Sequence, residues 1–297
     1  AFLAGNAAGT LLLGVMYRRR FGFPEVGWDP SAWLQVLRAN VPAGTAMFLA
    51  QSVSNLPPIV IGILLSNADA GIYSAGMKLI FLLLLVDRTL NSLFLPVATR
   101  YAVARSAEYP ALLSAVLTAI IVFMVPVLIG TCIVAHEAVF LVFGPGYEGA
   151  VPVVRVLTGY VLLTLLNSIM ICTLVAFGRT RTYSLIVSGG ALIVCIMVVV
   201  FTVLFGPEGA GAGIITGEAV MLVLLIRAAY RVAPLPSFRF LLKPAIAGIA
   251  MAGSAFALSG LPPLTSFVAS TAFFVIVLFT INGVPRQEIR YLRERLI

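Results

Sequence analysis

Residues 59–100 read IVIGILLSNADAGIYSAGMKLIFLLLLVDRTLNSLFLPVATR, two apolar runs that are separated by a short polar segment at residues 66–70. A helix needs about 20 predominantly apolar residues to cross the hydrocarbon core of a bilayer. The second run, residues 71–97, exceeds that length, and the first run extends back to residue 41. The stretch therefore predicts two consecutive membrane spans.

The composition of the whole chain agrees with this prediction. Of its 297 residues, 61% are hydrophobic and 10% are charged, and the mean hydropathy is +1.10. A soluble domain carries roughly 25% charged residues. A water-soluble fold could not hide this much apolar surface in its interior, so the composition excludes an ordinary soluble enzyme. We expect an all-α, polytopic transmembrane helical bundle.

Apolar segments bounded by turn signals or charges predict about nine spans. They cover residues 1–17, 41–65, 71–97, 110–135, 151–177, 183–205, 210–229, 244–258 and 265–282. The first is short for a span and begins without a methionine, so we expect a fragment that starts within a helix. Residues 244–258 give the weakest signal, and a helix lying on the membrane surface is the alternative there.

The connectors between these spans alternate in charge. Sixteen of the 19 basic residues fall in one set: Arg18, Arg19, Arg20, Arg38, Arg100, Arg105, Arg179, Arg181, Arg227, Arg231, Arg239, Lys243, Arg286, Arg290, Arg293 and Arg295. The other set, residues 67–70, 136–149, 206–209 and 261–263, contains no Lys or Arg. The positive-inside rule assigns the basic set, including the C-terminus, to the cytoplasm. The excess charge of +8 is therefore a topology signal, and we expect contact with membrane lipids and not with nucleic acid.

Five ionisable residues remain within the spans: Lys78, Asp87, Arg88, Arg155 and Glu218. Charges at this depth are costly unless they are paired or hydrated, so each is a functional candidate. Lys78 and Arg88 are ten residues apart, about 15 Å along a helix, and define one cationic stripe with two stations. Such a stripe beside a water-filled cavity suits a phosphate or diphosphate group.

Each candidate has a structural alternative. Lys78 or Arg88 could pair with Glu218 or with backbone carbonyls to hold helices in register. Arg155 lies near the outer interface, where its side chain can reach the head groups. Glu218 and Asp87 are either ion-pair partners or, for Glu218, a protonatable group that couples transport to an ion gradient. Asp87 lies on nearly the opposite helix face from Lys78 and cannot pair with it within that helix.

Small residues and prolines predict close packing and interrupted helices. Gly209, Gly213 and Gly217 recur every four residues, a spacing that lets two helices approach closely, within the chain or between copies. Pro57 and Pro126 lie inside predicted spans, where the carbonyls that they free need new partners. Interrupted helices of this kind are typical of transporters.

The sequence contains no soluble catalytic motif. A phosphate-binding glycine loop, a His-Glu-x-x-His helix and a nucleophile elbow are all missing from it. Its three cysteines lie in apolar runs without metal-ligand spacing. We therefore expect no catalytic residues, no cofactor and no metal centre, and an ion or substrate gradient as the energy source.

Several motifs resemble the polysaccharide (Wzx-type) flippases of the MOP (MATE-like) superfamily. The similarity begins at Val41-Pro42, continues through Gly71-Ile72-Tyr73-Ser74-Ala75 with Lys78 following, and includes Leu95-Pro96 before Arg100. Further similarities are Phe143-Gly144 with Tyr147, Ala176-Phe177-Gly178-Arg179, and Gly209 to Glu218. Together they cover roughly residues 34–230, and the combination is more specific than any one motif.

The resemblance implies a two-lobe transporter that flips a polyprenyl-diphosphate-linked oligosaccharide to the outer leaflet of the inner (plasma) membrane during cell-surface polysaccharide synthesis. Residues 1–40 would be the end of the N-terminal lobe and a cytoplasmic connector, residues 41–230 the six-helix C-terminal lobe, and residues 231–297 an extra helix pair and basic tail. Lys78 matches a position that is often basic in these flippases, whereas Arg88 and Arg155 are added from depth alone. Polysaccharide polymerases and glycosyltransferases are the implied protein partners.

Two other functions remain open. A cation-coupled multidrug antiporter of the same superfamily would favour acidic cavity residues, and the spans hold three cations against two acids. A non-transporting membrane scaffold of polysaccharide assembly is the third possibility.

Overall fold

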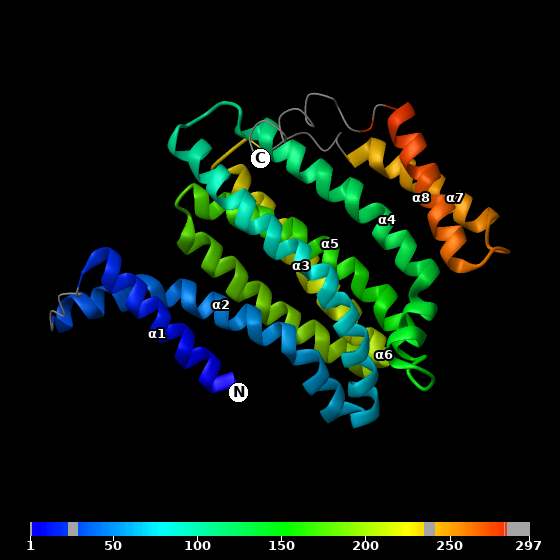
Figure 1. Cartoon of the computed structure of the whole chain (residues 1–297), viewed down its shortest axis with the longest axis horizontal. Coiled ribbons are helices and arrows are strands. Elements are labelled where there is room, and N and C mark those ends of the chain that lie inside the picture. The colour runs from blue at the N-terminus through cyan, green and yellow to red at the C-terminus, as the bar shows by residue number, and fades with distance from the viewer. Residues whose placement is uncertain (1, 23–28, 235–240, 282, 284–297) are drawn as a thin grey trace. The chain divides into compact units, whose positions relative to one another are not determined.

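A computed structural model describes residues 2–22, 29–234, 241–281 and 283 (Figure 1). The start of the first predicted span at Ala1, the end of the last predicted span at Asn282, Arg239 and the basic residues at 286–295 lie outside the described residues. The chain divides into two compact units, Ala1–Val41 and Pro42–Ile297.

The first unit contains helix α1 (Phe2–Phe21) and the start of helix α2 (Pro30–Leu64). Helix α2 starts where Asp29 accepts hydrogen bonds from the backbone N–H of Ser31 at 2.9 Å and of Ala32 at 3.2 Å, and from the Ser31 hydroxyl at 2.8 Å. These bonds satisfy amide groups that the first helical turn leaves unpaired. These hydrogen bonds lower the pKa of the Asp29 carboxyl. The bond from the Ser31 side chain has the largest effect, followed by those from the two amides.

The second unit is a helical bundle built around α5. Helices α3 (Asn67–Val103), α4 (Tyr109–Phe143) and α6 (Thr180–Tyr230) all pack against α5 (Ala150–Ala176). The largest fully buried side chains in this core include Tyr73, Phe94, Leu157 and Ile169. Six helices in the described part of the chain are long and apolar enough to cross a membrane. The predicted all-α membrane bundle is confirmed.

Helix α6 is a helical hairpin that turns at Gly206. This residue has φ 72° and ψ −151°, a backbone conformation that only glycine adopts readily. Residues 180–205 and 207–230 form the two limbs, which the sequence indicates as separate spans. A Cβ on Gly213 would lie 2.6 Å from the carbonyl oxygen of Met197, and one on Gly217 would collide with Val194. The small-residue face therefore packs within the chain.

The connector after α4 is shorter than the sequence suggests. The sequence places residues 136–143 in a loop, yet His136 and Glu137 belong to α4, which ends only at Phe143. The run from Ala138 to Phe143 is apolar and continues the helix without a break. Gly144, with φ 79°, ends it. The expectation that His136 lies in a connector is therefore wrong.

Helices α7 (Leu242–Ala257) and α8 (Pro263–Thr280) pair with each other and pack against α4 (Figure 1). Gly248 approaches Val125, and the Phe267 ring occupies the space beside Gly130, where a Cβ would not fit. Ala247 and Met251 of α7 are fully buried. Helix α7 is thus packed as a member of the bundle.

Prolines do not interrupt the helices where we expect breaks. The helical stretch of α2 includes Pro57, and α4 continues through Pro126. Among the described residues of the helices, the non-helical backbone lies instead at Gly206. Neither Pro57 nor Pro126 therefore ends its helix.

Candidate functional site

A cluster of polar side chains lies where α3, α5 and α6 meet. Asp87 and Asn91 come from α3, Asn167 and Ser168 from α5, and Glu218 from the second limb of α6. The Asn167 amide donates to a Glu218 carboxylate oxygen at 2.6 Å and to the Glu218 backbone carbonyl at 3.1 Å. One side chain on α5 therefore fixes both the side chain and the backbone of Glu218.

Local packing explains why these helices come so close. Gly217 precedes Glu218 and lies against Val194 of the first limb, where any larger side chain would collide. Gly211, in the same limb as Gly217, packs on Val156 of α5. Small residues on α6 thus let the backbone approach α5 until the Asn167 amide reaches it.

Asp87 lies at the other side of the cluster. Its polar neighbours are the side chains of Ser168 and Asn91, and Asn91 in turn accepts a hydrogen bond from the Cys172 thiol at 3.1 Å. One carboxylate oxygen of Asp87 is buried without a hydrogen-bond partner. The side-chain oxygen of Asn167, a residue only 2% exposed, is also buried and unpartnered.

A cavity of about 190 Å³ adjoins the cluster, and Asn167, Ser168 and Glu218 line it. Tyr160 and Thr164 of α5 and Ser54 of α2 add hydroxyl groups to its wall. A volume of this size admits several waters or a small cation. A carboxyl group in such a place is costly to ionise, so it either holds a proton or stays ionised beside a bound cation.

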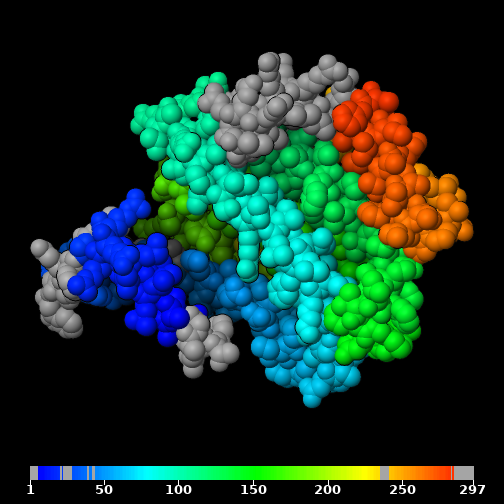
Figure 2. Space-filling model, in the orientation of Figure 1, coloured from blue at the N-terminus to red at the C-terminus, as the bar shows by residue number. Residues whose placement is uncertain are grey.

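The cationic stripe lies on the open side of α3. Lys78 and Arg88 are both exposed, and the surface of α3 is visible along much of its length in the space-filling view (Figure 2). Leu82 and Leu85 between them are also exposed. Among the described residues, neither cation forms an ion pair or hydrogen bond. In the described residues the Glu218 carboxylate is bonded to Asn167, and neither Lys78 nor Arg88 is paired with it.

The structure separates the five sequence candidates into three places. Asp87 and Glu218 border one polar cluster, and Lys78 and Arg88 lie on the open face of α3. Arg155 is exposed near the start of α5, next to the buried Val154, and belongs to neither group.

Sequence reasoning missed Asn167. The search of the predicted spans considered only ionisable residues, and the side chain of asparagine is not ionisable. A signal is nevertheless present, because a buried amide in the middle of an apolar span also needs a partner.

Comparison with known proteins agrees with this architecture. The bundle and its intramembrane polar groups define a polytopic membrane protein. A protein-family model described as "Polysaccharide biosynthesis protein" matches residues 1–152, just over half of the chain. The chain belongs to this family. No curated protein matches it.

The fold is similar to that of a solved transporter. The structure titled "Lipid II flippase MurJ, inward closed conformation" matches 96% of this chain with a TM-score of 0.71 and 12% sequence identity. The chain spans 65% of that protein's length. At this identity the likeness establishes the fold alone.

Proposed function

We propose that this chain is part of a transporter that moves a polyprenyl-diphosphate-linked oligosaccharide to the outer leaflet of the inner (plasma) membrane. Residues 1–40 would end an N-terminal lobe, residues 41–230 form the C-terminal lobe, and residues 231–297 add a helix pair and a cytoplasmic tail. The family and the MurJ-like fold support a lipid-linked substrate. Polymerases and glycosyltransferases of polysaccharide synthesis are the proposed partners.

The observation that carries this proposal is the open, unpaired cationic face of α3 with Lys78 and Arg88. A diphosphate offers several acceptor oxygens, and guanidinium and ammonium groups bind them through charge-assisted hydrogen bonds. The two cations are about 15 Å apart along the helix axis. They would therefore engage the diphosphate in succession as it crosses, with Arg155 as a further contact near the outer interface.

A flipping assay tests this role. Full-length protein in proteoliposomes is supplied with a polyprenyl-diphosphate oligosaccharide, and transfer between leaflets is followed for Lys78→Ala and Arg88→Ala. A hydrogen bond to a charged group contributes about 1.5–3 kcal/mol, so each substitution should slow transfer roughly tenfold or more. Arg227→Ala removes an exposed cation of α6 outside the stripe and should leave the rate unchanged. Equal rates for all three variants and the parent would refute the proposal.

Arg155→Ala separates the two interpretations of that residue in the same assay. A loss of transfer comparable to Lys78→Ala supports a substrate contact. An unchanged rate leaves Arg155 as an interfacial side chain and removes it from the binding site.

We further infer that Glu218 and Asp87 couple transport to a cation gradient. The buried, unpartnered side-chain oxygen of Asn167 supports this role, because Asn167 and Glu218 line one cavity whose described lining holds no cationic side chain. Asp87 adds a second buried, unpartnered oxygen, next to Arg88 in the chain and under the influence of its charge. Glu218→Gln keeps the volume and an acceptor for Asn167 while removing the carboxylate. We expect this variant to bind the lipid normally but to transport at a rate that no longer responds to a proton or sodium gradient.

A cation-coupled antiporter of small molecules is the second candidate function, and the same acidic cluster favours it. If the parent does not flip the lipid but exchanges a cationic drug for protons or sodium, and Glu218→Gln abolishes the exchange, this function replaces the first.

A further inference from the structure

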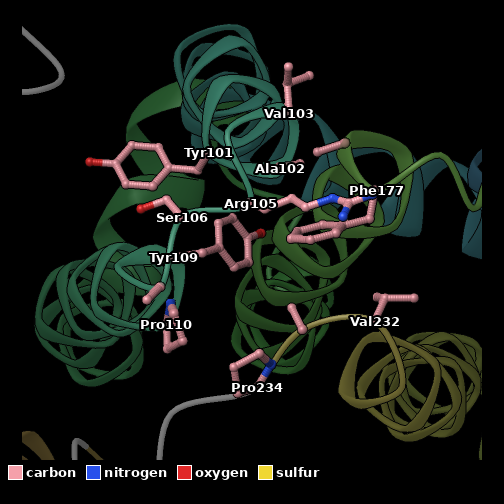
Figure 3. Close-up of a pocket in the computed structure, with 13 residues that line it drawn as sticks. Tyr101, Ala102, Val103, Arg105, Ser106, Tyr109, Pro110, Phe177, Val232 and Pro234 are labelled. Atoms are coloured by element: carbon pink, nitrogen blue, oxygen red, sulfur yellow. The ribbon is translucent and has the colours of Figure 1, made fainter.

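A second cavity in this unit lies away from the polar cluster, at the end of the bundle that carries the basic connectors. Its volume is about 630 Å³. Its wall is formed by the end of α3, the α3–α4 turn, the start of α4, the end of α5 and residues 232–234 after α6 (Figure 3). The positive-inside rule assigns this end to the cytoplasmic face, at the level of the lipid head groups.

Arg105 is the cation of this cavity, and it occupies a backbone position that normally belongs to glycine. Its φ is 47°, and it is the one non-glycine residue with positive φ in the described chain. The Ser106 N–H donates to the Tyr101 carbonyl at 3.1 Å, so the turn ends α3 in the manner of a Schellman cap. At the corresponding end of α5 the left-handed residue is Gly178.

An arginine that is kept in an unfavourable backbone conformation suggests a task for its side chain. Arg105 is exposed, and within the described residues it forms no ion pair or hydrogen bond through its guanidinium. The nearby acidic residue Glu108 lines an adjoining cavity of about 220 Å³ together with Arg100, and neither of them lines the cavity of Arg105. The guanidinium of Arg105 is therefore available to an external anion.

The remaining wall of the cavity combines one hydroxyl donor with a broad apolar surface. The Ser106 hydroxyl accepts a hydrogen bond from the Glu108 N–H at 3.2 Å, which leaves its own hydrogen free to donate. Tyr109 and Phe177 form an edge-to-face pair with ring centroids 5.0 Å apart, and Figure 3 shows the Arg105 side chain extending toward Phe177. The Tyr109 hydroxyl is already engaged with Thr173 at 2.7 Å, so the aromatic floor is rigid.

We propose that this cavity binds the head group of an anionic phospholipid, with the phosphate on Arg105 and Ser106. A charged rim beside an aromatic and aliphatic wall suits a molecule that is anionic at one end and apolar at the other. Basic pockets between helices at the cytoplasmic face bind such head groups in other membrane proteins. A soluble phosphate would use the rim but gain nothing from the apolar wall.

The experiment uses the full-length protein in nanodiscs of phosphatidylcholine with and without phosphatidylglycerol, and native mass spectrometry measures the anionic lipid retained. Arg105→Gly removes the guanidinium and relieves the left-handed backbone, so this variant should fold at least as well as the parent. Its retention of phosphatidylglycerol should fall about fivefold. Arg181→Ala removes an exposed cation at the same end that does not line the cavity, and it should retain the lipid.

A second variant tests the cavity itself. Ala107 is exposed on the rim, and Ala107→Trp should block the space without changing any charge. Loss of lipid in Arg105→Gly and Ala107→Trp but not in Arg181→Ala supports the proposal. Equal losses in Arg105→Gly and Arg181→Ala would mean that only surface charge matters. Displacement of the lipid by inorganic phosphate at equal concentration would show a soluble anion site. Either result overturns the lipid site.

Discussion

The α6 hairpin makes a prediction whose sign can be worked out from the structure. A Cβ on Gly213 would lie 2.6 Å from the Met197 carbonyl oxygen and 2.7 Å from the Val198 nitrogen. Ordinary contacts of a Cβ begin near 3.4 Å, so Gly213→Ala must separate the limbs by about 0.8 Å. Both obstructing atoms are backbone, and no rotamer change can relieve the contact.

The expected magnitude follows from two opposing effects. Overpacking of this kind costs about 3 kcal/mol, at the upper end of the usual range, because the backbone must move. Replacing glycine by alanine within a helix contributes about 1 kcal/mol of stabilisation. The net destabilisation is therefore about 2 kcal/mol.

Gly189 provides the matched control, since it lies in the other limb, is exposed, and has no atom within 4 Å of the place that a Cβ would occupy. Gly189→Ala should gain about 1 kcal/mol. The two variants, identical in chemistry, should differ by about 3 kcal/mol.

Thermal unfolding of the purified protein in one detergent, followed by intrinsic fluorescence, measures this difference. Each kcal/mol corresponds to roughly 2–4 °C in the apparent melting temperature. If Gly213→Ala melts at or above the parent temperature, or if both variants shift in the same direction by the same amount, the argument from backbone contact fails.

Two further predictions concern side-chain hydrogen bonds. Tyr109→Phe removes the bond to Thr173 at 2.7 Å but keeps the ring contact with Phe177, so unfolding experiments should show a loss of about 1 kcal/mol; no loss would mean that the bond contributes nothing net. Because the folded-state pKa of Asp29 is lowered, its contribution to α2 is present above the ordinary carboxyl pKa and is lost as pH falls through the folded value. The protection of the Ser31 amide against hydrogen exchange, taken relative to its intrinsic rate at each pH, should fall over that acidic range. In Asp29→Ala this protection should be missing throughout the pH range.

The sequence alone predicts the all-α class and which helix faces pack closely. It does not predict which helix each of these faces packs against. The four-residue spacing of Gly209, Gly213 and Gly217 predicts a close helix contact, but spacing does not identify the opposing surface. That surface is the preceding limb, because Gly206 reverses the chain. Helix ends are less predictable, since the apolar run of α4 carries the helix beyond His136.

In the candidate site, too, the sequence predicts some residues, and only the structure reveals their contacts. Depth in the membrane identifies Glu218 and Asp87, because ionisable groups stand out in an apolar run. Their neighbour Asn167 becomes visible only from the 2.6 Å contact. Faces of one helix can be assigned by periodicity, as for Lys78 and Asp87, whereas contacts between helices depend on rotations about their axes that the sequence does not specify.

The close contact between the limbs of α6 has a mechanical consequence. Limbs that meet backbone to backbone at Gly213, and that are joined by a single left-handed residue, cannot slide or open without losing that contact. The hairpin should therefore move as one rigid body during any conformational cycle, and Glu218 should move with it. Changes in the environment of Glu218 would then arise from displacement of the hairpin against α5 and α3, and distance probes placed on the two limbs should report a constant separation in every state.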